Sequence, residues 1–555
     1  MHFALNMITS TLMLILPLPL FFLGLLIGRR SGPEHPIRGM RRMIMGSVWF
    51  SLICAIGATG TYAEGMVQST PYFSFDLPFG LGQLAIRTEV NDLTVVMLLL
   101  VAFVGFIVAR YSYTYLDGDS RRMYFLRWFS LTLGSFFTLI ASGNMWFFML
   151  SWIATSLFLN KLLAFYRDRP GAVLATRKKY LLDRIADVSL FAAFVLIVRT
   201  LHTSQFSHIA TALTVMHGSL PVALQIASGL LVLSAVLKSA QFPFHGWLIQ
   251  VMEAPTPVSA LLHAGIIYTG AFLILRMAPL LARVEWAQGA LILIGLFALA
   301  MTSLMMMTST QIKGSLAYST GAQMGFMLLE CGLGLYSLAV LHIISHSAYK
   351  AHAFLSSGSV VDHYRAPVLP HVSRTATVWN LVLSLLLSTF IASGIGILVG
   401  VHFSKQRALI VMGVILTVAI SQLFLQVLNK QKIKKSRLLL TMIVVSLSIS
   451  TAYFGLDALF EVLLGRSFPA VQVLTNTLGN LLLGLITAVF VGLLLIQQML
   501  PRIRYYPFWQ YVYVHLYNGL YMDMLLTRWV QKFGPIGYLE FVQKVKEGRS
   551  QEVIS

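Results

Sequence analysis

Charged residues are scarce in this chain: only 11% of its 555 residues are Asp, Glu, Lys or Arg, whereas 57% are hydrophobic. So few polar groups cannot cover the surface of a soluble globule of this length. Apolar runs close to the roughly 20 residues that cross a bilayer recur along the whole chain, which favours helices over the weakly alternating strands of a barrel. We therefore expect an all-α polytopic membrane protein with about 13–15 transmembrane helices.

Acidic residues are the scarcest charged group, with 20 Asp and Glu against 40 Lys and Arg, which gives a formal net charge of +20. A basic chain can bind nucleic acid, but here the basic clusters at 38–42, 167–179 and 430–437 lie in short loops between apolar runs. That distribution follows the positive-inside rule instead. It predicts a multi-pass membrane protein, in contact with lipids and not with nucleic acid. The N-terminus is expected outside and the C-terminus in the cytoplasm.

Cysteine is nearly absent: the sequence has only Cys54 and Cys331. Both lie in apolar runs and have no neighbours at metal-ligand spacing. The sequence also lacks a phosphate-binding loop, a dinucleotide fingerprint and the HExxH and CxxC patterns. These absences predict no cofactor or metal in this chain and no enzymatic activity of its own. The chain therefore needs a gradient or a partner as its source of energy.

The sequence does contain a strip of bases inside the apolar run 334–359. His342, His346 and Lys350 are spaced four apart, and His352 follows. Residues four apart share one helical face, and both histidine and a desolvated lysine can exchange protons near neutral pH. A single intramembrane histidine is more often a hydrogen-bonded packing residue, but three bases on one face favour a proton or cation path.

A second intramembrane lysine, Lys238, ends an apolar run and is followed by Pro243. Thr256 and Pro257 then have the pattern of a helix start. Broken helices in membranes commonly flank ion sites, although an ordinary loop would explain the same pattern. The neighbouring ionisable residues favour the first interpretation.

One carboxylate completes the candidate relay. Asp187 lies deeper in its span than Asp183, so we expect Asp187 to be the partner that tunes Lys238. Glu253 is either a solvated loop residue or a charge partner at the cytoplasmic mouth. The six relay candidates are Lys238, His263, His342, His346, Lys350 and Asp187. The supporting candidates are His245, Glu253, Ser319, Gln323, His352 and Gln422.

Four stretches carry a family resemblance: LKSAQFPFHGWL at 237–248, MEAPTPVSALLHAG at 252–265, QIKGSLAYST at 311–320 and HSAYKA at 346–351. They resemble the antiporter-like membrane subunits of respiratory complex I and of multisubunit Na⁺/H⁺ antiporters. The resemblance covers roughly residues 91–426. It implies two inverted repeats of five helices, each with a broken helix, around a polar axis that moves protons.

Carried over residue by residue, the resemblance matches Lys238 to the lysine of the first broken helix and His263 to the histidine of the next span. Lys350 matches the central lysine and Asp187 an acidic residue near the first half-channel. The expected domains are N-terminal transmembrane helices at 1–90, the conducting core at 91–430, C-terminal transmembrane helices at 431–500, and an aromatic, amphipathic cytoplasmic or interfacial tail at 501–555.

Two departures from the family pattern stand out. Trp152 is followed by Ile153, where the family usually has a glutamate that pairs with the first lysine. The second broken helix is expected to carry a Lys or Glu, but it offers only Lys405 near its start, with Gln422 and Gln426 deeper.

The altered stretches include SWIATSL at 151–157, LYSLAVLH at 335–342 and YKAHAFLSSGS at 349–359. They resemble the DabB family of membrane subunits of inorganic carbon accumulation systems. That resemblance implies a DabA-like partner, a large cytoplasmic zinc protein similar to a β-carbonic anhydrase, so zinc is expected in the partner. It also implies that H⁺, or less readily Na⁺, flows inward to drive one-way CO₂ hydration. The alternatives are a proton-pumping subunit of a complex I-like or Mrp-type complex, and a membrane anchor that does not conduct.

Overall fold

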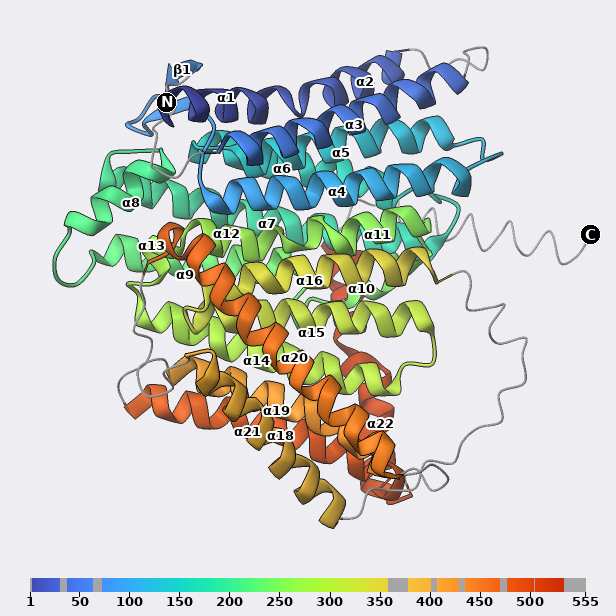
Figure 1. Ribbon diagram of the computed structural model, residues 1–555. Coiled ribbons are helices and arrows are strands. Elements are labelled where there is room, and N and C mark those ends of the chain that lie inside the picture. The colour runs from blue at the N-terminus through green and yellow to red at the C-terminus, as the bar shows by residue number, and fades with distance from the viewer. Residues whose placement is uncertain are drawn as a thin grey trace, which may run out of the picture.

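The computed structural model describes residues 2–29, 37–62, 72–357, 378–400, 407–428, 435–469, 477–503 and 505–533. Within these ranges the protein is a bundle of helices with one small hairpin, β1 (Phe73–Asp76) and β2 (Gln83–Ile86), paired antiparallel with Phe73 opposite Ile86 (Figure 1). Lys405 and residues 534–555 of the expected tail lie outside the described residues, as does the side chain of Gln426.

The helices of the first half are α1 (His2–Ile15), α2 (Leu18–Arg29), α3 (Ile37–Thr61), α4 (Asp92–Tyr115), α5 (Arg122–Ala141), α6 (Met145–Leu163), α7 (Pro170–Leu201), α8 (Phe206–Val215), α9 (Val222–Lys238), α10 (Gly246–Gln250), α11 (Thr256–Ala264), α12 (Thr269–Arg276) and α13 (Ala278–Leu281). Those of the second half are α14 (Glu285–Thr308), α15 (Ile312–Gly332), α16 (Tyr336–Leu355), α18 (Val378–Leu398), α19 (Arg407–Leu428), α20 (Lys435–Leu464), α21 (Thr477–Ile503), α22 (Pro507–Tyr517) and α23 (Met522–Phe533). The 3₁₀ turns are η1 (Val251–Glu253), η2 (Ile266–Tyr268), η3 (Gly465–Ser467) and η4 (Gly519–Tyr521).

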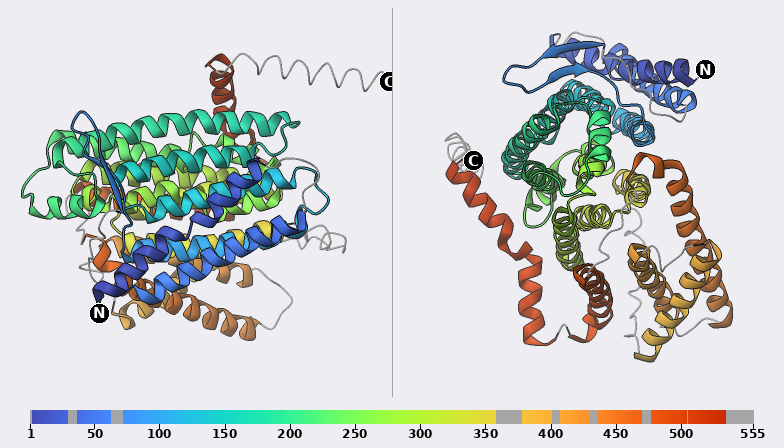
Figure 2. Two further views of the ribbon diagram at one scale, coloured as in Figure 1. Left: turned by 90° about the horizontal axis from the view of Figure 1, so that it is seen from above. Right: turned by 90° about the vertical axis from the view of Figure 1, so that its left-hand side faces the viewer.

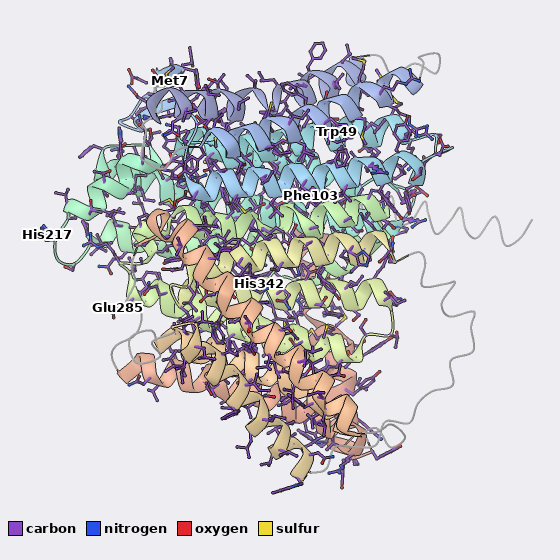
Figure 3. The ribbon with its side chains drawn as sticks, viewed as in Figure 1. Met7, Trp49, Phe103, His217, Glu285 and His342 are labelled. Carbon is purple, nitrogen blue, oxygen red and sulfur yellow. The ribbon has the colours of Figure 1, made fainter. Side chains whose placement is uncertain are left out.

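Eleven helical segments of the described chain are long and apolar enough to cross a membrane. Helices α7, α9, α15 and α16 are too short or too polar for that criterion, but they pack among the eleven as parts of the same bundle. The predicted all-α polytopic fold is therefore confirmed. Trp49 and Phe103 lie exposed on the outer face of α3 and α4, as expected for side chains that meet lipid (Figure 3).

Capping side chains mark where several spans begin. Asn91 accepts a hydrogen bond from the backbone N–H of Thr94 and so starts α4, and Asn144 accepts from Trp146 and Phe147 and so starts α6. Pro257 lies in the first turn of α11, as the sequence predicts, because its missing N–H would have no partner there. These local signals set the ends of helices that carry the polar residues of the core.

Two interruptions place backbone and side chains at unusual angles inside the bundle. Helix α9 ends at Lys238, the chain leaves the helical path through Ala240, whose φ is +50°, and it resumes at α10. The sequence predicts this break. A further interruption, at Gly265 between α11 and α12, was not expected: Gly265 has φ −138° and η2 follows before the helix continues.

The structure corrects the expectation that all of 167–179 is a basic loop. Helix α7 begins already at Pro170, and Lys178 and Lys179 are buried within it. A proline with fixed φ at the first helical position favours this early start. The two lysines remain inside because acidic side chains pair with them, which hydropathy along the sequence does not reveal.

The end of the chain forms an arm on the outside of the bundle. We define the C-terminal arm as residues 507–533, comprising α22, η4 and α23. Figure 2 shows the arm on the side of the bundle away from α20. Helix α23 contacts α7 and α10, so the described part of the tail that the sequence predicts as cytoplasmic or interfacial is docked on the helical bundle.

The close contact between α14 and α15 gives a test of the fold. A methyl group added at Gly325 of α15 would lie 2.6 Å from the backbone oxygen of Gly295 on α14 and 2.8 Å from the nitrogen of Leu299. Because backbone cannot rotate away as a side chain can, we expect Gly325→Ala to lower the free energy of unfolding by about 1–3 kcal/mol. Denaturation in detergent micelles measures this. The control is Gly289→Ala on α14, where nothing lies within 4 Å of the added methyl. Equal stability of the two variants would contradict the close approach of α14 and α15.

Candidate functional site

Lys238 sits in a cluster of buried charges formed by α7 and α9. Its Nζ donates to Ser156 on α6 and lies 3.2 Å from Oδ1 of Asp183. Asp183 also accepts a hydrogen bond from Lys179, one turn earlier on α7. All three charged side chains are nearly inaccessible, so each needs the others as counter-charges. We call Lys179, Asp183, Asp187 and Lys238 the first cluster.

Asp183, and not the expected Asp187, is the nearer carboxylate to Lys238. The distance from Nζ of Lys238 to Oδ1 of Asp187 is 3.9 Å. Asp187 instead accepts from Nε1 of Trp152 at 2.8 Å and pairs with Arg184 at 2.7 Å. The spacing of Lys179 and Asp183, four apart on one helix, is the signal in the sequence that could have identified this pair.

The carboxylates beside Lys238 come from α7, and the glutamate that the family resemblance leads one to expect after Trp152 on α6 is absent. Nζ of Lys238 lies 4.7 Å from the centre of the Trp152 ring, and the same indole donates to Asp187. An intramembrane ammonium group needs a negative charge nearby, and here α7 provides it.

The strip on α16 forms a second cluster with side chains of α15 and η2. His342, which Figure 3 labels, bridges two neighbours: its Nδ1 lies 2.9 Å from Oε2 of Glu330 and its Nε2 lies 2.7 Å from Oε1 of Gln323. One turn further, Nδ1 of His346 lies 2.8 Å from the hydroxyl of Tyr268. The rings of His342 and His346 have centroids 6.2 Å apart, so consecutive bases are neighbours without a direct hydrogen bond.

Lys350 and His263 complete this second cluster. Lys350 donates to Ser319 and to the backbone oxygen of Leu316, at 2.8 Å for the latter, and is fully buried. Nδ1 of His263 lies 3.0 Å from the hydroxyl of Thr320, and Tyr268 donates to the His263 carbonyl at 3.1 Å. We define the second cluster as His263, Tyr268, His342, His346 and Lys350.

Three polar residues in or beside the second cluster were not identified from the sequence: Glu330, Tyr268 and Thr320. Glu330 is 2% exposed and pairs with His342 across the turn between α15 and α16. Its position inside the apolar run 315–331 was a visible signal, because an unpaired carboxylate is rarely found in a lipid-spanning helix. Tyr268 and Thr320 carry no such signal, since hydroxyl-bearing side chains are ordinary in membrane helices.

Several buried polar atoms have no hydrogen-bond partner in the described part of the chain. They include Nε2 of His263 and of His346, both in the second cluster. Ser239 and Ser259 have unpartnered hydroxyls as well, the first directly after Lys238 and the second one turn before His263. Within the described ranges no hydrogen bond joins the two clusters directly. Buried polar atoms of this kind commonly bind internal water, so the arrangement suits proton transfer through side chains and water.

Two supporting candidates contact the relay residues and four do not. Ser319 binds Lys350 and Gln323 binds His342. His352 lies exposed at the end of α16. Gln422 donates to Gln497 at 2.9 Å, between α19 and α21.

His245 and Glu253 have other neighbours. The His245 ring is buried between Phe242 and Tyr318, with ring centroids 5.2 Å and 6.1 Å away. The Glu253 carboxylate accepts from the backbone N–H of Ala172 at 3.1 Å, which satisfies a free donor in the first turn of α7. Within the described ranges, no three His, Cys, Asp or Glu side chains are grouped so that they could hold a metal ion.

The chain is similar to known membrane proteins over most of its length. Residues 142–429 match the family described as NADH:quinone oxidoreductase/Mrp antiporter, TM, and residues 77–126 match the complex I chain 5 N-terminus. The protein named "Probable inorganic carbon transporter subunit DabB2" of Halothiobacillus neapolitanus is 40% identical over 531 residues, covering 95% of each chain. The DabB subunit of Hydrogenovibrio crunogenus is 41% identical over 355 residues, covering 64% of each chain.

A solved chain of the Mrp complex from Dietzia has the same fold. The TM-score is 0.53 at 19% identity, and the match covers 99% of this chain and 60% of that one. The chain thus belongs to the antiporter-like membrane subunits of NADH:quinone oxidoreductases and Mrp antiporters, and within them to the DabB subunits of inorganic carbon transporters.

Proposed function

We propose that this subunit conducts protons inward across the bacterial cytoplasmic membrane and passes the energy of the gradient to a DabA-like cytoplasmic partner that binds zinc and hydrates CO₂. The observation that supports this most is the pair of buried clusters, which place exchangeable bases beside carboxylates and hydroxyls in the middle of membrane helices. We assign inorganic carbon as the transported substrate because the chain belongs to a family of inorganic carbon transporter subunits.

In the proposed mechanism each cluster holds one exchangeable positive charge. A proton that reaches His342 beside Glu330 moves to His346 and then, through water and the hydroxyls of Tyr268 and Thr320, towards His263 and Lys350. Charging Lys350 disfavours a further positive charge nearby, and so alters the affinity for the next proton. In the first cluster Lys238 exchanges its proton while Asp183 and Lys179 keep the charge balanced.

The expected orientation agrees with this direction of flow. The hairpin and α8 lie at the left-hand end of Figure 1, and the loops after α4 and α6 lie at the opposite end. These loops contain Arg121, Arg167 and Arg169. By the positive-inside rule we assign that opposite end to the cytoplasm. The C-terminal arm docks near the start of α7 at this end, where the partner would bind.

A proton-pumping role in a redox-driven or Mrp-type complex is the second candidate, and the fold shared with the Mrp chain favours it. An agent that collapses the proton gradient distinguishes gradient-driven carbon transport from this pumping role. We expect a protonophore to abolish bicarbonate accumulation in cells that express this chain with its partner, because the gradient supplies the energy. Intracellular inorganic carbon measured with labelled bicarbonate gives the result. Uptake that survives both the protonophore and removal of sodium would refute gradient-driven transport.

Lys350 gives the direct test of the second cluster. In the described structure no carboxylate forms an ion pair with it, so the charge on Lys350 depends on exchange with its neighbours. We expect Lys350→Ala to reduce bicarbonate accumulation by roughly a hundredfold, as loss of a proton-transfer group does in other proteins. Co-purification with the partner should be unchanged. Lys161→Ala, which removes an exposed lysine at the end of α6, is the control and should transport normally. Normal uptake by the Lys350 variant would favour an anchor that does not conduct.

The first cluster gives a ranked prediction for two aspartates. Asp183→Asn removes the carboxylate shared by Lys179 and Lys238, whereas Asp187→Asn leaves that pairing intact. We therefore expect Asp183→Asn to lose at least about tenfold more uptake than Asp187→Asn, because a buried charge without its partner costs several kcal/mol. Uptake is normalised to the amount of assembled complex. The reverse order would identify Asp187 as the functional counter-charge of Lys238.

A further inference from the structure

The C-terminal arm reaches a buried charge at the edge of the first cluster. Nζ of Lys178, on α7, lies 2.6 Å from Oδ1 of Asp523 on α23 and 3.0 Å from Oε1 of Gln250 on α10. Nε2 of Gln250 donates to the other oxygen of Asp523 at 2.6 Å. We call these three residues the Lys178 triad. Among the described residues Asp523 is the only carboxylate that pairs with Lys178.

Asp523 is the residue of the Lys178 triad that can separate from the others, because its side chain is more exposed than that of Lys178. The Lys178 side chain is 0% exposed and that of Asp523 is 33% exposed. Lys178 belongs to the long α7, while Asp523 belongs to an arm that follows the last long helix. If the arm moves away, Lys178 keeps its place but loses its counter-charge, which is strongly unfavourable for a buried ammonium group. The position of the arm and the charge on Lys178 are therefore linked.

The Lys178 triad adjoins the first cluster along the chain and through α10. Lys179, the next residue, pairs with Asp183, which in turn pairs with Lys238. Nζ of Lys179 lies 5.4 Å from the ring of Trp247, and α10 also contributes Gln250 to the triad. A change of charge at Lys178 thus acts on Lys179 across a short distance in a low-dielectric environment.

The arm also holds the segment between α9 and α10 that follows Lys238. Phe242 in this break packs in one apolar cluster with Leu516, Leu520 and Met522 of the arm. The arm lies so close to Gly246 that an added methyl group would clash with Oδ1 of Asp523 and lie 2.9 Å from its Cβ. The arm therefore closes over both the break and the Lys178 triad.

We propose that the C-terminal arm is a detachable plug on the cytoplasmic side of the first cluster. With Asp523 on Lys178 the plug is closed and the cluster does not exchange protons with the cytoplasm. Binding of the cytoplasmic partner displaces the arm, water reaches Lys178, and Lys179, Asp183 and Lys238 gain a path to the cytoplasm. The inference rests on the proposed function, and it adds that the subunit conducts protons only when the partner is bound.

Two variants open the plug by different physical means. Asp523→Asn weakens the ion pair without a change in size, and Gly246→Ala pushes the arm outward without a change in charge. In proteoliposomes that contain the subunit without its partner, we expect each to raise proton flux roughly tenfold over the natural protein, within the usual range of coupling between sites. The control is Arg528→Gln, an exposed residue on α23, and its flux should match that of the natural protein. Unchanged or lower flux in both folded variants would overturn the plug.

Movement of the arm has its own test that does not depend on conduction. A spin label on Arg528→Cys reports the arm, because the natural Cys54 and Cys331 are buried. We expect its mobility to rise when the partner is added. An immobile label in the assembled complex would overturn the plug even if protons flow. A label that becomes mobile in a complex without any proton flux would instead refute the proposed conduction.

Discussion

A positive charge inside a membrane bundle needs a counter-charge or a hydrogen-bond acceptor, and much of this protein is arranged to supply one. Lys178, Lys179 and Lys350 are buried and the side chain of Lys238 is only 7% exposed, and these four lysines meet the need in three ways. Lys179 and Lys238 both form an ion pair with Asp183. Lys178 forms an ion pair with Asp523, which lies far away in the sequence. Lys350 donates hydrogen bonds to oxygen atoms of α15. The scarcity of acidic residues makes each of these pairings consequential, because few alternative partners exist.

Interrupted helices place these groups where a continuous helix would not. The end of α9 at Lys238 lets that side chain meet α6 and α7 together. The break at Gly265 brings Tyr268 between the His263 carbonyl and His346, and so connects α11 to the strip on α16. Backbone that leaves the helix inside a membrane must be lined by protein or water, and the orphaned polar atoms near both breaks fit that requirement.

This chain departs from the wider antiporter pattern in having no glutamate after Trp152. The carboxylates nearest to Lys238 belong to Asp183 and Asp187 on α7, and Trp152 donates a hydrogen bond to Asp187. An anchor that had lost conduction would have no reason to keep buried carboxylates next to a buried lysine, since both are costly without function. The cost of these buried charges supports the proposed conducting role of this subunit.

The sequence by itself determined the membrane class, the helical fold, the break after Lys238 and the strip of bases, because length, hydropathy and periodicity are local properties. It also carried the family resemblance in short motifs. Which carboxylate meets which lysine was decided only by the tertiary structure. The pairing of Lys238 with Asp183 and not Asp187, the pairing of Glu330 with His342 and the docking of Asp523 on Lys178 all depend on contacts between different helices. Such contacts follow from the packing of whole helices against one another, and no local pattern records them.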